Sequence, residues 1–253
     1  MELKKIIPCL DFKDGRVVKG IKFLDVKEVG DPVTCAIAYC EQGADELAML
    51  DISATTEGRG TMLSAVENVA KHVTIPFCVG GGIRSVQDAT DVLNAGASKV
   101  SVGSAAVARP ALLRELIEAF DDKRIVLGMD AGKGDSPSGF VVFTGAGQVN
   151  TGIDAAVWAR QAADAGIKEI LLTSTDRDGT KAGYDLALTK LVAQESGAAV
   201  TASGGAGNMQ DIYDALVEGE AAAALAASLF HYGEINIREL KQYLKDRGVN
   251  VAI

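Results

Sequence analysis

Ile6-Ile7-Pro8-Cys9-Leu10-Asp11 is a short apolar run that ends in a carboxylate, and Ile125-Val126-Leu127-Gly128-Met129-Asp130 repeats this pattern 119 residues later, close to half of the 253-residue chain. Each run predicts a buried strand with an aspartate at its C-terminal end. In a closed parallel barrel these strand ends form the active face, so Asp11 and Asp130 are predicted to be an acid/base pair. The alternative is structural, with each carboxylate accepting a hydrogen bond from a loop amide.

Strand-like and helix-like segments alternate along the chain. We expect strands at about residues 6–11, 47–52, 75–80, 98–103, 124–130, 169–174, 198–203 and 221–227. We expect amphipathic helices at about residues 31–43, 60–72, 86–95, 110–120, 153–165, 184–196, 208–218 and 234–247. Eight such units predict an α/β protein with a closed (β/α)8 TIM barrel. A doubly wound sheet would need an early G-x-G-x-x-G turn, which residues 11–20 do not contain.

An internal repeat supports the barrel. Three pairs of segments align, at offsets of 123, 123 and 124 residues: 43–51 with 166–174, 79–82 with 202–205, and 101–104 with 225–228. We therefore predict one domain, residues 1–253, with half-barrel repeats of about residues 1–121 and 122–253.

Two connections, residues 12–30 and 131–152, are longer than a barrel needs. They follow the strands that carry the two aspartates, and long loops at this face are usually functional or mobile. The second is rich in glycine around Phe140-Val141-Val142-Phe143 and predicts an inserted hairpin. In the first, Lys19 is a candidate to close over an anionic substrate, and an ordinary solvated lysine is an equal alternative.

Composition excludes several classes of function. The net charge of −9 argues against broad nucleic-acid binding. Four cysteines without a C-x-x-C pair predict a reducing cytosol and no disulfide framework. With only His72 and His231, we expect no metal site and no histidine-dependent triad. We also expect no cofactor, no signal peptide and no membrane span.

Glycine-rich turns follow strands in both halves. Gly80-Gly81-Gly82 follows the third predicted strand and Ser203-Gly204-Gly205 the seventh, while Gly103-Ser104 and Ala227-Ser228 follow the fourth and eighth. Backbone amides at such turns bind phosphate because no Cβ blocks the approach. One cradle in each half predicts a substrate with two phosphates. Tight corners without a ligand are the alternative.

Charged residues of alternating sign begin four predicted strands at the opposite, N-terminal face: Lys5, Glu46, Lys99 and Glu169. They predict a salt-bridged ring. The pattern alone favours a stabilising surface network over a gate into the barrel interior.

Several of these motifs together resemble one family. They are residues 7–20, 79–84, 171–185, 202–207 and 226–231, and the resemblance extends from residue 4 to about residue 251. The chain is similar to the cyclase subunits of imidazole glycerol phosphate synthase. The stretch Asp176-Arg177-Asp178-Gly179-Thr180-Lys181-Ala182-Gly183-Tyr184-Asp185 is highly specific, whereas the Gly-Gly-Gly motif is shared with other phosphate-binding barrels.

The resemblance implies a cytosolic enzyme of histidine biosynthesis. It would use ammonia from a glutaminase partner, in a heterodimer joined at the N-terminal barrel face. It would convert a bis-phosphorylated formimino-carboxamide ribonucleotide to imidazole glycerol phosphate and an aminoimidazole carboxamide ribotide. The resemblance also implies that Asp11 and Asp130 are the acid/base residues, that Lys19 lies on an active loop, and that the charged ring is the ammonia entrance. Four further side chains would line the site: Asp51, Thr173, Ser174 and Asp178.

The chain departs from the family pattern at some positions. Arginine is common in place of Lys5, aspartate in place of Ser98, Asn-Thr in place of Gly103-Ser104, and isoleucine in place of Met129. The first two changes affect partner binding and gating more than chemistry, because lysine lacks the bidentate geometry of arginine and serine makes no ion pair. Three rival hypotheses stay open: the sister isomerase of the same pathway, a non-catalytic phosphate-binding barrel, and a paralogue that delivers ammonia elsewhere.

Overall fold

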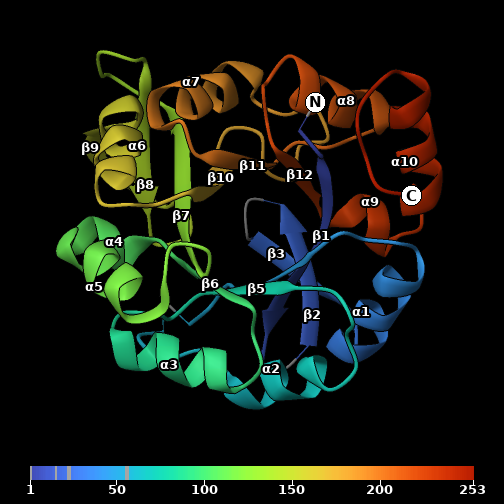
Figure 1. The fold of residues 1–253 in the computed structure, drawn as a ribbon, viewed down its shortest axis with the longest axis horizontal. Helices are drawn as coiled ribbons and strands as arrows, with labels where there is room; N and C mark the ends of the chain where they lie inside the picture. Colours follow the sequence, from blue (N-terminus) through green and yellow to red (C-terminus); the bar gives the residue numbers. More distant parts are fainter. Residues whose placement is uncertain (1, 15, 22–23, 55–56) are drawn as a thin grey trace.

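Eight parallel strands form a closed barrel in the computed structural model (Figure 1). The structure describes residues 2–14, 16–21, 24–54 and 57–253, and of those between 19 and 29 it describes only the backbone. The barrel strands are β1 (Lys5–Lys13), β4 (Leu47–Asp51), β5 (Phe77–Gly80), β6 (Lys99–Val102), β7 (Ile125–Lys133), β10 (Glu169–Ser174), β11 (Ala199–Ser203) and β12 (Ala223–Ala226). They pair in chain order, and the β12–β1 and β7–β10 pairings complete the circle. The predicted (β/α)8 barrel is confirmed.

Helices surround the strands in chain order (Figure 1). They include α1 (Pro32–Glu41), α2 (Leu63–Ala70), α3 (Val86–Asn94), α5 (Ala111–Phe120), α6 (Ala155–Asp164), α7 (Leu186–Ser196), α8 (Met209–Val217) and α10 (Ile237–Asp246). The eight predicted helices are confirmed, with ends that differ by a few residues. Within the described ranges, no helix is long and apolar enough to cross a membrane.

Both long connections contain antiparallel hairpins. The predicted hairpin after β7 is confirmed as β8 (Phe140–Thr144) and β9 (Val149–Asp154). The interpretation of residues 12–30 as a loop is wrong, because they form β2 (Arg16–Ile21) and β3 (Leu24–Gly30), with β2 paired to the end of β1. Register shifts interrupt the pairing of β2 with β3, so these two strands do not show one continuous alternation of side chains.

Two short helices were not predicted, α4 (Ser104–Ala108) and α9 (Ser228–His231). With five and four residues, they are too short to show a helical period in sequence. They begin at the two serines that were predicted to lie beside the phosphate cradles, so the two halves of the barrel share this feature as well.

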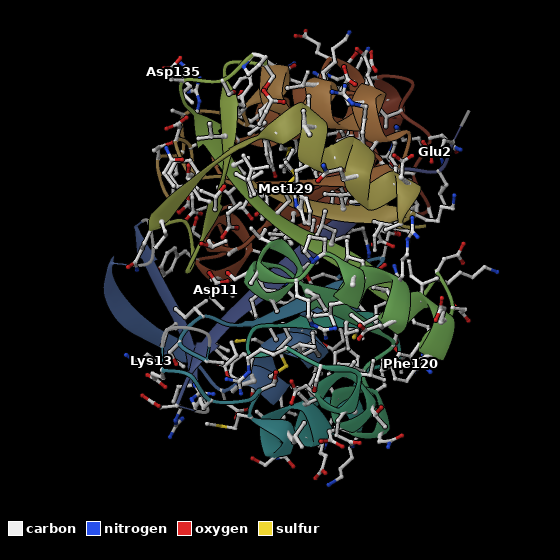
Figure 2. All side chains as sticks on the ribbon, turned by 90° about the vertical axis from the view of Figure 1, so that its left-hand side faces the viewer. Glu2, Asp11, Lys13, Phe120, Met129 and Asp135 are labelled. Atoms are coloured by element: carbon white, nitrogen blue, oxygen red, sulfur yellow. The ribbon has the colours of Figure 1, made fainter. Side chains whose placement is uncertain are left out.

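Side chains on β1 alternate between two apolar cores. On β1, Ile6 and Leu10 belong to the large core between strands and helices, whereas Ile7 and Cys9 belong to a smaller cluster inside the barrel. Because the side-chain period of a strand is two, Asp11 continues the inward row of Ile7 and Cys9. In Figure 2, Lys13 and Asp135 lie at one end of the barrel and Glu2 and Phe120 at the other, which separates the C-terminal from the N-terminal face.

Candidate active site

Two adjoining cavities open at the C-terminal face of the barrel. The predicted residues that line the first are Asp11, Thr173, Asp178, Gly204, Gly205, Ala227 and Ser228. Those that line the second are Asp51, Gly81, Gly82, Gly103, Ser104, Asp130 and Thr173. The two cavities meet at Leu50 and Thr173. The structure therefore brings most of the predicted site residues together, with one aspartate of the pair and one glycine turn in each cavity.

Each aspartate lies beside the glycine turn of the other half of the chain. Asp11 is on β1, which pairs with β12 of the second half, and so it shares a cavity with Gly204 and Gly205. Asp130 is on β7, which pairs with β6 of the first half, and so it shares a cavity with Gly81 and Gly82. Because the barrel is closed, each cavity is lined by residues from both halves of the chain.

The backbone of the two turns requires glycine. Gly81 and Gly82 have φ angles of 95° and 74°, and Gly204 and Gly205 have φ angles of 89° and 109°. These values lie in a region that other residues adopt only with strain. A Cβ on Gly81 would lie 2.2 Å from the Asp51 carbonyl oxygen, and one on Gly205 would lie 2.2 Å from the carbonyl oxygen of Gly183. Close packing against the preceding loop therefore accounts for glycine here, whether or not a ligand binds.

The two aspartates differ in their electrostatic surroundings. Burial and the nearby Asp178 carboxylate raise the pKa of Asp130 to about 6, against the opposing effect of a hydrogen bond from the Gly147 amide. Asp11 is 5% exposed, and its Oδ1 lies 3.3 Å from the Cys9 thiol that donates to it. Asp130 is therefore able to hold or release a proton closer to neutral pH than an ordinary aspartate.

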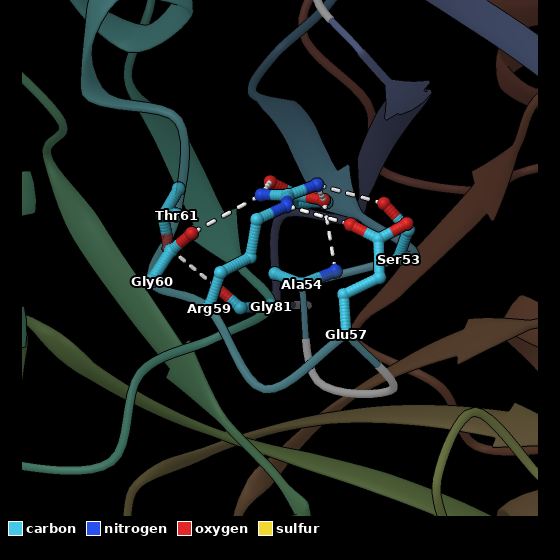
Figure 3. Close-up of polar contacts among 8 residues, drawn as sticks. Ser53, Ala54, Glu57, Arg59, Gly60, Thr61 and Gly81 are labelled. Carbon is cyan, nitrogen blue, oxygen red and sulfur yellow. Dashed lines mark hydrogen bonds and ion pairs between the residues drawn. The ribbon is translucent and has the colours of Figure 1, made fainter.

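Three other predicted site residues need separate comment. Ser174 is absent from the linings of both cavities, and its hydroxyl lies 3.4 Å from Asp185 Oδ2. Lys19 has its backbone on β2, but its side chain lies outside the described residues. Asp51 lines the second cavity, yet its carboxylate is bound on both oxygens by Arg59 (Figure 3).

Sequence reasoning missed Arg59. This residue lies in the loop between β4 and α2, eight positions after Asp51, and also bonds Ser53 Oγ at 2.7 Å and Glu57 Oε2 at 2.8 Å. Three acceptor side chains within eight residues of one arginine are a local signal that could have been noticed. This pattern does not show which of the three acceptors lines the cavity. Asp51 does so because it is the last residue of β4.

Neither histidine lines the two cavities. His231 Nδ1 lies 2.5 Å from the Tyr39 hydroxyl, and His72 Nδ1 lies 2.8 Å from the Asn68 carbonyl oxygen. In the part of the chain that the structure describes, no cluster of three or more His, Cys, Asp or Glu side chains is placed to hold a metal ion. The carboxylates that line these cavities are side chains suited to proton transfer.

Comparison with known proteins agrees with this geometry. A family model described as "Histidine biosynthesis protein" matches residues 5–236, which include both aspartates and both glycine turns. The chain belongs to the histidine biosynthesis protein family. It is 52% identical to imidazole glycerol phosphate synthase subunit HisF of Bacillus licheniformis and 53% identical to subunit HisF of Bacillus subtilis. Each alignment covers 251 residues, 99% of this chain and 100% of the relative.

In this member of the histidine biosynthesis protein family, the four charged residues at the N-terminal face form a connected chain of ion pairs. Glu46 Oε2 lies 3.2 Å from Lys5 Nζ, and Lys99 Nζ lies 3.0 Å from Glu46 Oε1 and 2.6 Å from Glu169 Oε2. Burial lowers the pKa of Lys99, but the hydrogen bonds and charges of the two glutamates outweigh it and raise that pKa above its usual value. The predicted ion pairing is therefore present, with Lys99 charged at its centre.

Ser98 precedes Lys99 in sequence, beside these ion pairs, and its side chain contacts the backbone of β5. Its hydroxyl oxygen accepts a hydrogen bond from the Phe77 amide at 3.2 Å, where β5 begins. A serine at this position of the family fold therefore stabilises the start of a strand and presents no charge at the N-terminal face.

Proposed function

We propose that this chain is the cyclase subunit of imidazole glycerol phosphate synthase. It would convert a bis-phosphorylated formimino-carboxamide ribonucleotide and ammonia to imidazole glycerol phosphate and an aminoimidazole carboxamide ribotide. The observation that carries the proposal is the pair of adjoining cavities, each with one aspartate and one glycine turn, in a chain that matches HisF relatives over its whole length. A substrate with a phosphate at each end fits two turns separated by one reaction centre.

Asp11 and Asp130 would move protons during ring closure and cleavage. Incorporating ammonia into a ring requires proton transfer to and from nitrogen and oxygen, and a positioned carboxylate provides this. With a pKa of about 6, Asp130 is suited to exchange a proton near neutral pH. Asp11 faces the same centre from the opposite wall, across the junction at Thr173. The amides of the Gly81-Gly82 and Gly204-Gly205 turns would hold the phosphates.

Ammonia would reach these residues through the barrel. The interior below the aspartates is lined by uncharged side chains, including Ile7, Ala48, Cys78 and Leu171. Such a lining admits neutral ammonia and disfavours ammonium, because an unpaired charge is costly in an apolar interior. The ion-paired residues at the N-terminal face would then act as the entrance.

A glutaminase would supply the ammonia from the N-terminal face, in a cytoplasmic heterodimer. Leu3, Val217 and Ile253 are large apolar residues with 49%, 46% and 64% exposure. Leu3 precedes β1, and Val217 ends α8, the helix before β12. Ile253 lies two residues after Val251, which pairs with Lys4, so all three lie near this face. Exposed apolar residues near the charged entrance are suited to a protein interface.

The decisive assay combines the purified chain with the bis-phosphorylated substrate and an ammonium salt at alkaline pH. We expect formation of both products. Asp11→Asn serves as the inactive control. Turnover of the isomerase substrate instead would favour the sister enzyme, and phosphate binding without any turnover would favour a non-catalytic barrel.

A further inference from the structure

One guanidinium organises the loop that follows β4. Each of the five N–H groups of Arg59 has an acceptor: the two Asp51 oxygens at 2.6 and 2.9 Å, Ser53 Oγ, Glu57 Oε2 and the Gly60 carbonyl at 3.1 Å (Figure 3). Asp51 Oδ1 also accepts from the Ala54 amide at 3.1 Å. The described residues of this loop, 51–54 and 57–60, are therefore arranged around Arg59, and lysine with three donors cannot reproduce this arrangement.

This loop is the outer wall of the first glycine turn. A Cβ on Gly82 would lie 2.9 Å from each of three loop atoms, Ala54 Cβ, the Arg59 carbonyl oxygen and the Thr61 amide nitrogen. Thr61 Oγ1 donates a hydrogen bond to the Gly81 carbonyl oxygen. Arg84, just after the turn, donates to the Gly58 carbonyl oxygen at 2.9 Å. The position of this turn, which lines the second cavity, thus depends on the loop.

The second half of the barrel holds its turn differently. The repeat offset of 123 residues places Ala182 at the position of Arg59, and the arginine of the β10–α7 loop, Arg177, donates instead to the Ala182 carbonyl oxygen at 3.1 Å. There, the Gly183 amide donates directly to the Gly205 carbonyl oxygen at 2.9 Å. The Gly204-Gly205 turn is hydrogen-bonded directly to the backbone of its loop, whereas the Gly81-Gly82 turn packs against a loop that the Arg59–Asp51 ion pair holds.

We propose that Arg59 is a positioning residue for one end of the substrate only, acting through Asp51 and the β4–α2 loop to set phosphate affinity at the Gly81-Gly82 turn. The proposal rests on the proposed function, in which each turn binds one phosphate. It follows that Asp51 acts in the second cavity as the partner of Arg59 and as part of the wall, with both carboxylate oxygens already engaged.

The two products provide separate reporters, because each carries one phosphate. We expect Arg59→Ala to raise the inhibition constant of one product about tenfold and to leave that of the other within about twofold. The KM for the substrate should rise more than kcat falls, since the acid/base residues are untouched. Arg59→Lys, which keeps the charge and reduces the risk of misfolding, should show the same selectivity with a smaller change.

A second experiment uses crystallography and does not depend on enzyme turnover. Crystals of the unaltered protein in inorganic phosphate should hold an anion at both turns, and those of Arg59→Lys should lose occupancy at Gly81-Gly82 while keeping it at Gly204-Gly205. Arg160→Ala, which removes an exposed ion pair between Arg160 on α6 and Glu195 on α7, is the matched control and should change neither the product inhibition constants nor the bound anions.

Equal changes for both products, or no change in either, would overturn the role of Arg59 while leaving the cyclase assignment intact. Retention of phosphate at both turns in the Arg59 variants would do the same. Absence of phosphate from both turns of the unaltered protein would instead overturn the phosphate sites themselves, and the role of Arg59 with them.

Discussion

Thr173 and Asp130 are paired residues across the β7–β10 seam that closes the barrel. Both line the second cavity, and Thr173 also lines the first. The junction between the cavities is therefore a direct consequence of barrel closure, which brings residues 43 positions apart into one strand register. This topology places the two glycine turns on either side of one junction between the cavities.

The aspartates are the first test of the mechanism. Asp11→Asn or Asp130→Asn should lower ammonia-dependent turnover by about 10²-fold or more, because asparagine keeps the shape but transfers no proton. Circular dichroism should show that the fold persists. Asp164→Asn, at the exposed end of α6, is the control and should retain activity. Near-normal turnover of both site variants would rule out their acid/base role.

The raised pKa of Asp130 predicts an effect on stability. Its folded-state pKa of about 6 exceeds the ordinary value of 3.8, so ionisation is less favourable in the folded protein. The contribution to stability is fully present below about pH 4 and is lost as the pH rises through about 6. Asp130→Asn should avoid this loss and be more stable than the unaltered chain at pH 8, by on the order of 1–3 kcal/mol.

Denaturant unfolding from pH 4 to pH 8 measures this difference. The gain in stability of Asp130→Asn should grow up to about pH 6 and then level off. Asp178→Asn should give a partial gain with the same pH dependence, since its charge is the second cause of the raised pKa. A variant that is equally stable or less stable at pH 8 would contradict the raised pKa.

The proposed phosphate sites at the glycine turns can be tested with a pair of glycine substitutions. Gly81→Ala and Gly43→Ala both place alanine at a positive φ, 95° and 85°, which costs about 1–2 kcal/mol in strain. Only at Gly81 does the new Cβ also collide, at 2.2 Å from the Asp51 carbonyl oxygen, whereas nothing lies within 4 Å at Gly43. Gly81→Ala should therefore lose affinity for the substrate, and Gly43→Ala should lose stability alone. Equal substrate affinity in the two variants would argue against a phosphate at this turn.

Sequence predicted the regular parts of this protein well for physical reasons. The barrel strands are buried runs bounded by glycine and polar residues, and the helices carry long amphipathic patterns, so both have clear periods. The hairpin β2–β3 escaped because it has no continuous apolar run like residues 140–143, and α4 and α9 escaped because they are shorter than two turns. The inserted hairpin β8–β9 was visible from its glycines around a single apolar run.

The candidate site was less accessible to sequence than the fold. The placement of Asp11, Asp130 and the glycine turns follows from strand ends in a closed barrel, and so it was predictable. Ser174 was placed with Thr173, but neighbouring residues on a strand point to opposite sides, and Ser174 contacts Asp185 instead. The five contacts of Arg59 depend on the path of a loop, which composition and periodicity do not determine.

The ion pairs at the N-terminal face provide the last test. Lys99 is 14% exposed and bridges Glu46 and Glu169, so it closes this part of the proposed ammonia entrance. Ammonium supplied in bulk reaches the active face from solvent, whereas ammonia from the glutaminase must cross the barrel.

Lys99→Ala removes both charge and bulk, and Lys99→Met removes the charge but keeps most of the bulk. With saturating partner, Lys99→Ala should change glutamine-dependent turnover by a different factor from ammonium-dependent turnover, and Lys99→Met should separate occlusion from charge. If both activities change equally in Lys99→Ala, or neither changes, the four residues are a structural network and the gate hypothesis fails.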